Sequence, residues 1–293
     1  MENSTVLGRV GVALPITFSS TPHADLQRDA AAKLEAAGYG TAWTNEVLGK
    51  DALVQLGVLL AATERMTFGT GVANIWVRAP QTTHAAAALL AQAHPGRFAL
   101  GLGVGYPQQA EAVGREFGSP LATMRDYVSK MDEPTWPPAA DGAYPRLIAA
   151  NGPKMLALAA EIADGALPAT RPTAFTVQAR EILGPGKLLV MGLTVIPDGD
   201  RAAARAAVAP FLAMPNAVAS FAGLDFTEQD VTEASDRLVD ALVAYGSPDR
   251  IAAKVREHLA AGADHVELML PIDTDYATGV DQFVELAPAL TSL

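Results

Sequence analysis

The feature that most constrains the fold is a strict alternation of short apolar runs with segments of helical periodicity. The runs are continuously apolar, which is typical of parallel strands buried on both faces. The expected strands are 9–15, 41–46, 66–75, 98–105, 146–151, 165–169, 187–197 and 265–271. Because each run is followed by a helical pattern, all-β folds and helical bundles are excluded. A count of eight favours a (β/α)8 TIM barrel over an open doubly wound sheet.

Helical periodicity and helix-capping residues occur between the expected strands. Apolar residues recur at helical spacing from Ala24 to Gly38, and Asp51 is a typical N-cap residue. Two stretches depart from simple alternation. Residues 132–144 form a Pro-rich loop, and an irregular helical insertion follows the seventh strand, from residue 200 to 233. Residues 235–245 are expected to resume a regular helix.

Composition bounds the class of protein. The chain has 293 residues, of which 50% are hydrophobic and 18% charged, and this length suits a barrel folded as one domain over residues 1–293. The absence of cysteine excludes disulfides and thiolate metal sites. A net charge of −11 without a Lys/Arg-rich run argues against a nucleic-acid or anionic-membrane partner. No signal peptide is expected in 1–15, and the apolar run 52–62 is too short to span a bilayer, so a cytoplasmic protein is expected.

The ends of the predicted strands are rich in glycine, alanine and amides and poor in charge. In a barrel these ends carry the chemistry. The five histidines lack the H-x-x-x-H spacing of a metal site, so no metal is expected. No G-x-S-x-G elbow occurs, which argues against a serine hydrolase. The glycines of 101–105 lack the spacing and the acidic partner of a dinucleotide fingerprint.

Two stretches suggest a bound ligand. The third strand reads FGTGVANIWV over 68–77, and glycine inside a strand marks a bulge or the close approach of something to the backbone. The stretch AANGPK over 149–154 ends a strand and begins a helix at Pro153, so its free N–H groups and Lys154 suit an anion. The alternative there is an ordinary helix start with a solvent-facing lysine.

Long stretches of the chain resemble the bacterial-luciferase-like flavin and deazaflavin oxidoreductases, a TIM-barrel superfamily. The similar runs are TERMTFGTGVANIWVRAPQTTHAAAALLAQAHPGRFALGLGVGY (63–106), LATMRDYVSKMD (121–132), RLIAANGPKMLALAAEIADGALP (146–168) and the tail 235–268. The resemblance is greatest to the actinobacterial branch that uses coenzyme F420, an 8-hydroxy-5-deazaflavin. It implies a luciferase-like barrel with the helical insertion after strand 7.

The resemblance also implies where a tricyclic cofactor binds. The family's third strand ends in a bulge with a non-prolyl cis peptide, which falls here at Gly71–Val72 and supports the ring. The implied cofactor-binding residues are Thr70, Gly71, Val72, Asn74, Gly103, Val104, Gly105, Ala150, Asn151, Gly152, Lys154, Thr170 and Arg171.

The sequence departs from the family pattern at two positions that carry acid–base groups in many relatives. Asn45 and Glu46 stand where many deazaflavin members have Asp-His, and Tyr106 stands where several have an acid. Glu46 and Tyr106 are therefore the candidate catalytic residues. The alternatives are a structural loop residue for Glu46 and a packing aromatic for Tyr106, and the same choice applies to Trp76.

The resemblance implies an oxidoreductase that transfers a hydride between coenzyme F420 and a small organic substrate. One alternative is an FMN-dependent luciferase-like monooxygenase that takes reduced flavin from a partner reductase, and another is an inert flavin-binding relative. A homodimer is expected by analogy with the family, with the alanine-rich segment 82–93 as a close-packing face.

Overall fold

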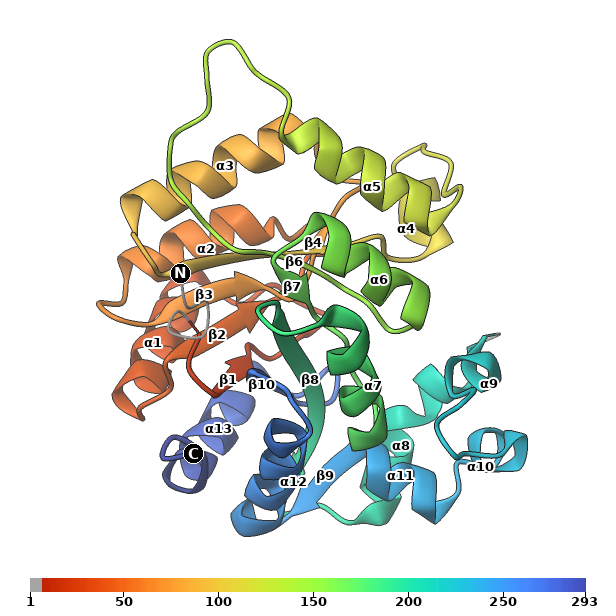
Figure 1. Cartoon of the computed structure of the whole chain (residues 1–293). Coiled ribbons are helices and arrows are strands. Elements are labelled where there is room, and N and C mark those ends of the chain that lie inside the picture. The colour runs from red at the N-terminus through yellow and green to blue at the C-terminus, as the bar shows by residue number, and fades with distance from the viewer. Residues whose placement is uncertain (1–6, 215) are drawn as a thin grey trace.

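The computed structural model describes residues 7–214 and 216–293 and confirms the predicted barrel (Figure 1). All strand pairings are parallel, and β10 pairs with both β1 and β8, which closes the cylinder. The strands of the closed barrel are β1 (Val10–Ala13), β2 (Thr41–Thr44), β3 (Thr67–Thr70), β5 (Phe98–Gly103), β6 (Arg146–Ile148), β7 (Gly165–Ala166), β8 (Leu188–Pro197) and β10 (His265–Met269). The first six residues, part of the stretch in which no signal peptide is expected, lie outside the described residues.

The third predicted strand is broken where its glycines stand. Residues 66–75 form β3 and a separate two-residue strand, β4 (Ala73–Asn74), which pairs only with β5. Between them lies a non-prolyl cis peptide at Gly71–Val72, as the family resemblance implied. The break falls at the carboxyl end of the barrel, where the mouth begins.

The barrel interior is filled by side chains and has two unusual polar residues, both on β10. Trp43 donates its Nε1–H to Nε2 of His265 at 3.1 Å, and the other ring nitrogen of His265 lies 2.9 Å from the Gly8 carbonyl. These two contacts assign a neutral ring with the proton on Nδ1. Burial correspondingly lowers the pKa of His265 to about 4. Gly69 is required beneath the indole, because a Cβ there would lie 2.3 Å from Trp43 Cζ3. Glu267 is two residues after His265 on β10, so its side chain faces the same interior.

Helices surround the barrel on all sides (Figure 1). They are α1 (Ala24–Ala36), α2 (Ala52–Ala61), α3 (Pro80–Ala93), α4 (Pro107–Glu111), α5 (Pro120–Met131), α6 (Pro153–Ile162), α7 (Thr173–Leu183), α12 (Pro248–Ala260) and α13 (Tyr276–Leu290). Asp51 caps α2 by accepting the Val54 N–H, and Pro153 begins α6, both as predicted. Helix α4 is shorter than the predicted helical segment 107–117.

The insertion after β8 is helical, as expected, but the helix predicted to follow it, 235–245, was partly wrong. The insertion contains α8 (Arg201–Leu212) and the short helices α9 (Ala217–Ser220) and α10 (Glu228–Thr232), and α11 (Asp236–Leu242) follows it. The predicted helix 235–245 stops at Leu242, and β9 (Val243–Gly246) follows. The residues VAYG suit a strand, and β8 extends beyond the barrel to provide the partner edge at Thr194–Pro197. Tertiary pairing therefore overrides the helical pattern there.

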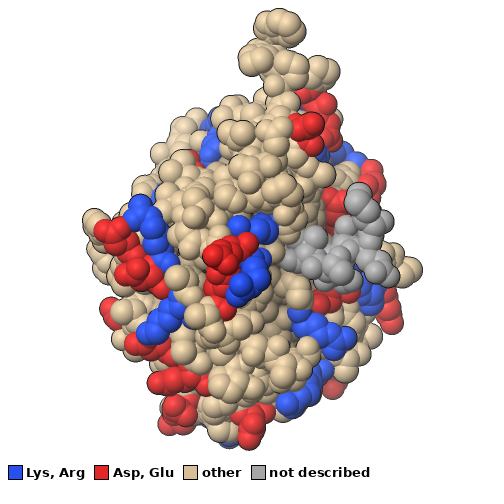
Figure 2. Space-filling model, turned by 90° about the vertical axis from the view of Figure 1, so that its left-hand side faces the viewer, with Lys and Arg blue, Asp and Glu red and all other residues tan. Residues whose placement is uncertain are grey.

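The outer surface carries charges of both signs. On the face in Figure 2, acidic and basic side chains are interspersed among uncharged areas, without a broad basic patch. The Pro-rich loop 132–144 between α5 and β6 projects from the barrel (Figure 1) and contains a cis Trp136–Pro137 bond. In the part of the chain that the structure describes, no helix combines the length and apolarity needed to cross a membrane.

Candidate functional site

The carboxyl ends of the strands open into two cavities. The first, which we call the Arg171 cavity, has a volume of about 660 Å³ and is bounded by the ends of β5 and β6, the start of α6, and the insertion. The second, which we call the Lys50 cavity, has about 750 Å³ and lies beside the loops after β1 and β2 and against α4. Both volumes fall in the range of small-molecule sites.

The Arg171 cavity brings together about half of the residues predicted to form the site. Those that line it are Val72, Gly103, Val104, Gly105, Tyr106, Asn151, Gly152 and Arg171. Those that line neither cavity are Glu46, Thr70, Gly71, Asn74, Ala150, Lys154 and Thr170. The first group comes from several strand ends, so the fold assembles it from distant parts of the sequence.

Glycines make one wall of this cavity flat. A Cβ at Gly103 would lie 2.3 Å from Cγ2 of Val72, so only glycine allows Val72 to lie against β5. Gly105 has a φ of +57°, a conformation that favours glycine, and its Cα faces the Gln109 side chain. The result is a wall of main chain and one branched side chain, which suits a flat ligand.

The N-terminus of α6 opens onto the same cavity. Gly152 is the N-cap residue and has no side chain to satisfy the first N–H groups of this ten-residue helix. Asn151 does not cap it, because its Oδ1 accepts the Ala169 N–H at 2.9 Å. The free N–H groups and the helix dipole favour an anion here. Lys154 is exposed and does not line the cavity, so it follows the alternative of a solvent-facing lysine.

Arg171 supplies a buried positive charge. It is 3% exposed, and its guanidinium lies 5.2–5.4 Å from the ring centres of Phe175, Phe211 and Phe221. One nitrogen donates to the carbonyl and hydroxyl of Ser220, whereas buried Nε has no hydrogen-bond partner among the described residues. Burial lowers its pKa to about 10. A buried cation without a carboxylate partner is costly, so an anionic ligand would stabilise this site.

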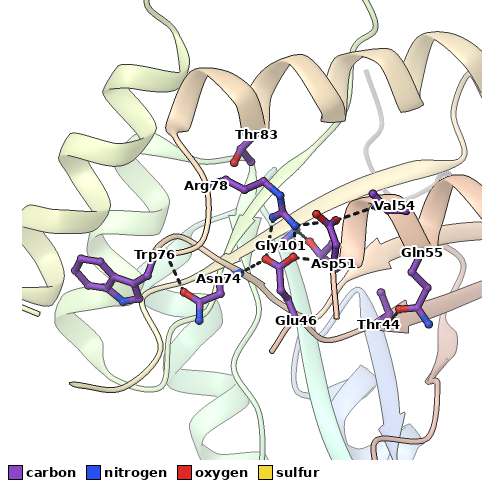
Figure 3. Close-up of polar contacts among 12 residues, drawn as sticks. Thr44, Glu46, Asp51, Val54, Gln55, Asn74, Trp76, Arg78, Thr83 and Gly101 are labelled. Carbon is purple, nitrogen blue, oxygen red and sulfur yellow. Dashed lines mark hydrogen bonds and ion pairs between the residues drawn. The ribbon is translucent and has the colours of Figure 1, made fainter. Parts of the chain in front are cut away.

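Glu46 lines neither cavity. Its side chain points toward Arg78 and Asn74 (Figure 3). Its carboxylate forms an ion pair with Arg78 and accepts the N–H groups of Ala52 at 3.0 Å and Asn74 at 2.9 Å. Arg78 also contacts Asp51 at 2.8 Å. Burial alone would lower the pKa of Arg78, but the hydrogen bonds and charges of the two carboxylates outweigh burial and raise it.

Main-chain hydrogen bonds from the neighbouring strand end hold the Gly71–Val72 turn in place. The Glu46 N–H donates to the Val72 carbonyl at 3.1 Å, and the Gly71 N–H donates to the Thr44 carbonyl at 2.8 Å. The Glu46 side chain is 1% exposed, and Arg78, Ala52 and Asn74 occupy its oxygens. The geometry therefore differs from the expected proton-transfer role and matches the alternative, a structural residue that positions the turn.

Other predicted site residues also hold the backbone. Thr70 exchanges two hydrogen bonds with Gly101, at 2.7 and 2.8 Å, and so joins β3 to β5. Asn74 accepts the Trp76 N–H at 2.9 Å through Oδ1 (Figure 3). Trp76 is buried and donates to the Val104 carbonyl at 2.7 Å, which matches the packing alternative. Thr170 has a φ of +55°, and its hydroxyl lies 3.4 Å from that of Thr194. Tyr106 is 51% exposed at the cavity mouth and remains a candidate that can contact a substrate.

Sequence reasoning missed several features of the site. The partners of Glu46 were not foreseen, nor was the contribution of the insertion, through Phe211 and Ser220, to the Arg171 cavity. Lys50, in the loop after β2, was also overlooked, although a lysine close to a strand end was a usable signal. The described residues contain no group of three or more His, Asp or Glu that could hold a metal ion.

Comparisons with known proteins agree on one family. A family model described as luciferase-like monooxygenase matches residues 9–265. A Mycobacterium tuberculosis protein, provisionally named as a coenzyme F420-dependent oxidoreductase, is 33% identical over 66% of this chain and 67% of its own. The 5,10-methylenetetrahydromethanopterin reductase of Archaeoglobus fulgidus is 27% identical over 82% of this chain and 88% of its own. The solved structure of an F420-dependent secondary alcohol dehydrogenase with an F420–acetone adduct superimposes with a TM-score of 0.75 at 18% identity, covering 96% of this chain and 98% of the other.

Proposed function

Since the chain belongs to the luciferase-like monooxygenase family, we propose that it is an oxidoreductase that uses coenzyme F420 to transfer a hydride to or from a small organic substrate. The resemblance to the F420 branch of the family agrees with the name of its relative in M. tuberculosis. Because fold alone does not fix chemistry, the proposal depends on the site.

The observation that carries the proposal is the composition of the Arg171 cavity. A flat wall of Val72 and Gly103 lies in the same cavity as the free N–H groups of α6 and the unpaired Nε of Arg171. A planar ring linked to a phosphate needs these two surfaces together. The residues present therefore fit the cofactor, with Val72 against the ring and Gly152 and Arg171 at the phosphate.

The chain contributes binding, orientation and exclusion of water. When bound, coenzyme F420 supplies or accepts a hydride at the carbon of ring position five. Val72 is held in place by the Glu46–Arg78 pair through the main chain, so the ring face has a rigid support. Tyr106 lines the same cavity and is 51% exposed, so its hydroxyl is available to a ligand at the mouth.

FMN is the second candidate, favoured by the charge of the Arg171 cavity. Arg171 is the only charged residue among the described residues that line it, and the walls contributed by the insertion are mostly apolar. One cation suits a cofactor that ends in a single phosphate. An FMN enzyme of this family would be a monooxygenase supplied with reduced flavin by a partner reductase.

The test is a fluorescence titration of the purified protein with coenzyme F420 and, separately, with FMN. We expect saturable quenching of F420 at micromolar concentration and weaker binding of FMN. Arg171→Met should weaken F420 binding about tenfold or more, because it removes the buried cation, whereas the exposed Arg125→Met should not change it. Tighter binding of FMN would favour the monooxygenase, and binding of neither cofactor would refute both candidates. An inert relative would bind F420 but leave the reduced cofactor unoxidised with every substrate tried.

A further inference from the structure

The Lys50 cavity is lined by no described residue of the insertion, and large apolar side chains stand at its rim. Three of its lining residues are large, apolar and exposed: Phe18 at 60%, Leu48 at 55% and Val54 at 68%. Exposed apolar side chains that meet around one hollow mark a site for an apolar ligand. The cavity follows the ends of β1 and β2, so it belongs to the functional end of the barrel.

Lys50 lies in this cavity without a carboxylate partner. Its Nζ donates to Oδ1 of Asn45 at 2.8 Å, and among the described residues it forms no ion pair. The two nearby carboxylates, Glu46 and Asp51, are both bound by Arg78. Burial lowers the pKa of Lys50 to about 8, although the charge of Glu46 acts in the opposite direction. The ammonium group therefore retains donors that the protein does not use.

Tyr276, at the start of α13, provides an independent sign that a ligand belongs here. It lines the cavity, is 6% exposed, and its buried hydroxyl has no hydrogen-bond partner among the described residues. Two amides of the lining are already occupied, because Gln55 donates to Gln27 at 2.6 Å and Gln27 donates to the Pro22 carbonyl at 2.7 Å. Lys50 and Tyr276 therefore both have donors that a ligand oxygen can use.

We propose that the Lys50 cavity binds the organic substrate, a carbonyl compound with an apolar body, and that Lys50 hydrogen-bonds the reacting oxygen and exchanges a proton with it. The proposal rests on the proposed hydride transfer for its chemistry but not for its binding. It assigns the proton transfer to a residue other than Glu46, because the Glu46 oxygens already accept the N–H groups of Ala52 and Asn74.

The step balances in both directions. In reduction, the carbonyl carbon accepts the hydride with its electron pair, the C=O π bond breaks, and the oxygen takes a proton from the Lys50 ammonium. The neutral amine then recovers a proton from water. In oxidation, the neutral amine takes the alcohol proton as the hydride leaves. Reduction therefore requires protonated Lys50 and should slow above pH 8, whereas oxidation should speed up.

The binding test uses octanoate as the probe, because its carboxylate presents acceptor oxygens on an apolar body. Isothermal titration of the protein without cofactor should give saturable binding at pH 7. At pH 9.5 the affinity should be about 30-fold lower, because a pKa of about 8 leaves roughly 3% of Lys50 protonated. Lys50→Met should weaken binding at least tenfold at pH 7, and Lys50→Arg should keep binding at both pH values.

Lys130→Met is the matched control, since Lys130 is exposed and paired with Asp126 on α5, and it should bind octanoate as the unmodified protein does. Thermal unfolding of each variant checks that the fold is retained. No octanoate binding at millimolar concentration, equal binding by Lys50→Met, or affinity that does not change with pH would overturn the proposal. If octanoate binds as expected but F420 does not, the proposed cofactor is wrong and the cavity assignment stands.

Discussion

The buried carboxyl of Glu267 should make the protein less stable at high pH. Replacing Glu267 by glutamine should remove this loss of stability. Glu267 lies on β10 and is 2% exposed. Its Oε1 occupies the space beside Gly71, where a Cβ would lie 2.9 Å away, and its Oε2 has no hydrogen-bond partner among the described residues. Burial therefore raises the pKa of this carboxyl from 4.5 to about 8.

The sign and size follow from proton linkage. Below pH 4.5 the carboxyl is protonated in both the folded and the unfolded chain, so the full stability is present. As pH rises, the unfolded chain releases this proton while the folded chain keeps it, and stability is lost until the folded group also ionises near pH 8. Between pH 5 and pH 9 the loss is about 4 kcal/mol at about 1.4 kcal/mol per pKa unit.

The assay is urea unfolding at pH 5 and pH 9, analysed by linear extrapolation. The free energy of unfolding of the unmodified protein should fall between these pH values by about 4 kcal/mol more than that of Glu267→Gln. Glu64→Gln, at an exposed position, should behave as the unmodified protein does. If Glu267→Gln loses as much stability as the unmodified protein, the carboxyl is not held neutral and the reasoning fails.

Two further predictions concern the support and the wall of the site. Arg78→Met should lower the free energy of unfolding by about 3–5 kcal/mol in urea, because it leaves the buried Glu46 carboxylate unpaired, whereas Arg125→Met, which breaks an exposed pair, should cost less than about 1 kcal/mol. Gly103→Ala should weaken F420 binding at least tenfold in the fluorescence titration, because its Cβ would displace Val72. The control Gly40→Ala, which has open space around its Cβ, should not change F420 binding. Equal binding by both variants would contradict the role of this wall.

The barrel could be predicted because its signals are local and repeated. Each strand is a continuous apolar run and each helix has its own periodicity, so the order of elements follows without knowledge of any contact. The cis turn at Gly71–Val72 was placed by the family resemblance, and the glycines alone indicated only a bulge. The eight predicted residues that line the Arg171 cavity share one property, a place just after a strand end, which the barrel geometry turns into proximity.

What the sequence did not reveal depends on partners far along the chain. Glu46 and Arg78 are separated by 32 residues, and nothing near Glu46 indicates that its carboxylate is occupied. The same reason explains β9, whose four residues become a strand only because β8 extends past the barrel. The insertion that covers one cavity shows helical periodicity but no sign of the face to which it packs.

The cations at the barrel mouth differ in whether they have a carboxylate partner. In a chain with a net charge of −11, carboxylates are abundant, so buried cations could easily have been paired. Arg78 instead takes both Glu46 and Asp51, while Arg171 and Lys50, one in each cavity, have no ion-pair partner among the described residues. Leaving the buried Arg171 unpaired costs stability that an anionic ligand would recover, and the half-buried Lys50 keeps an ammonium group available to a second ligand. The one free cation in each cavity is therefore the basis for the two proposed assignments: an anionic cofactor group at Arg171, and an oxygen of the substrate at Lys50.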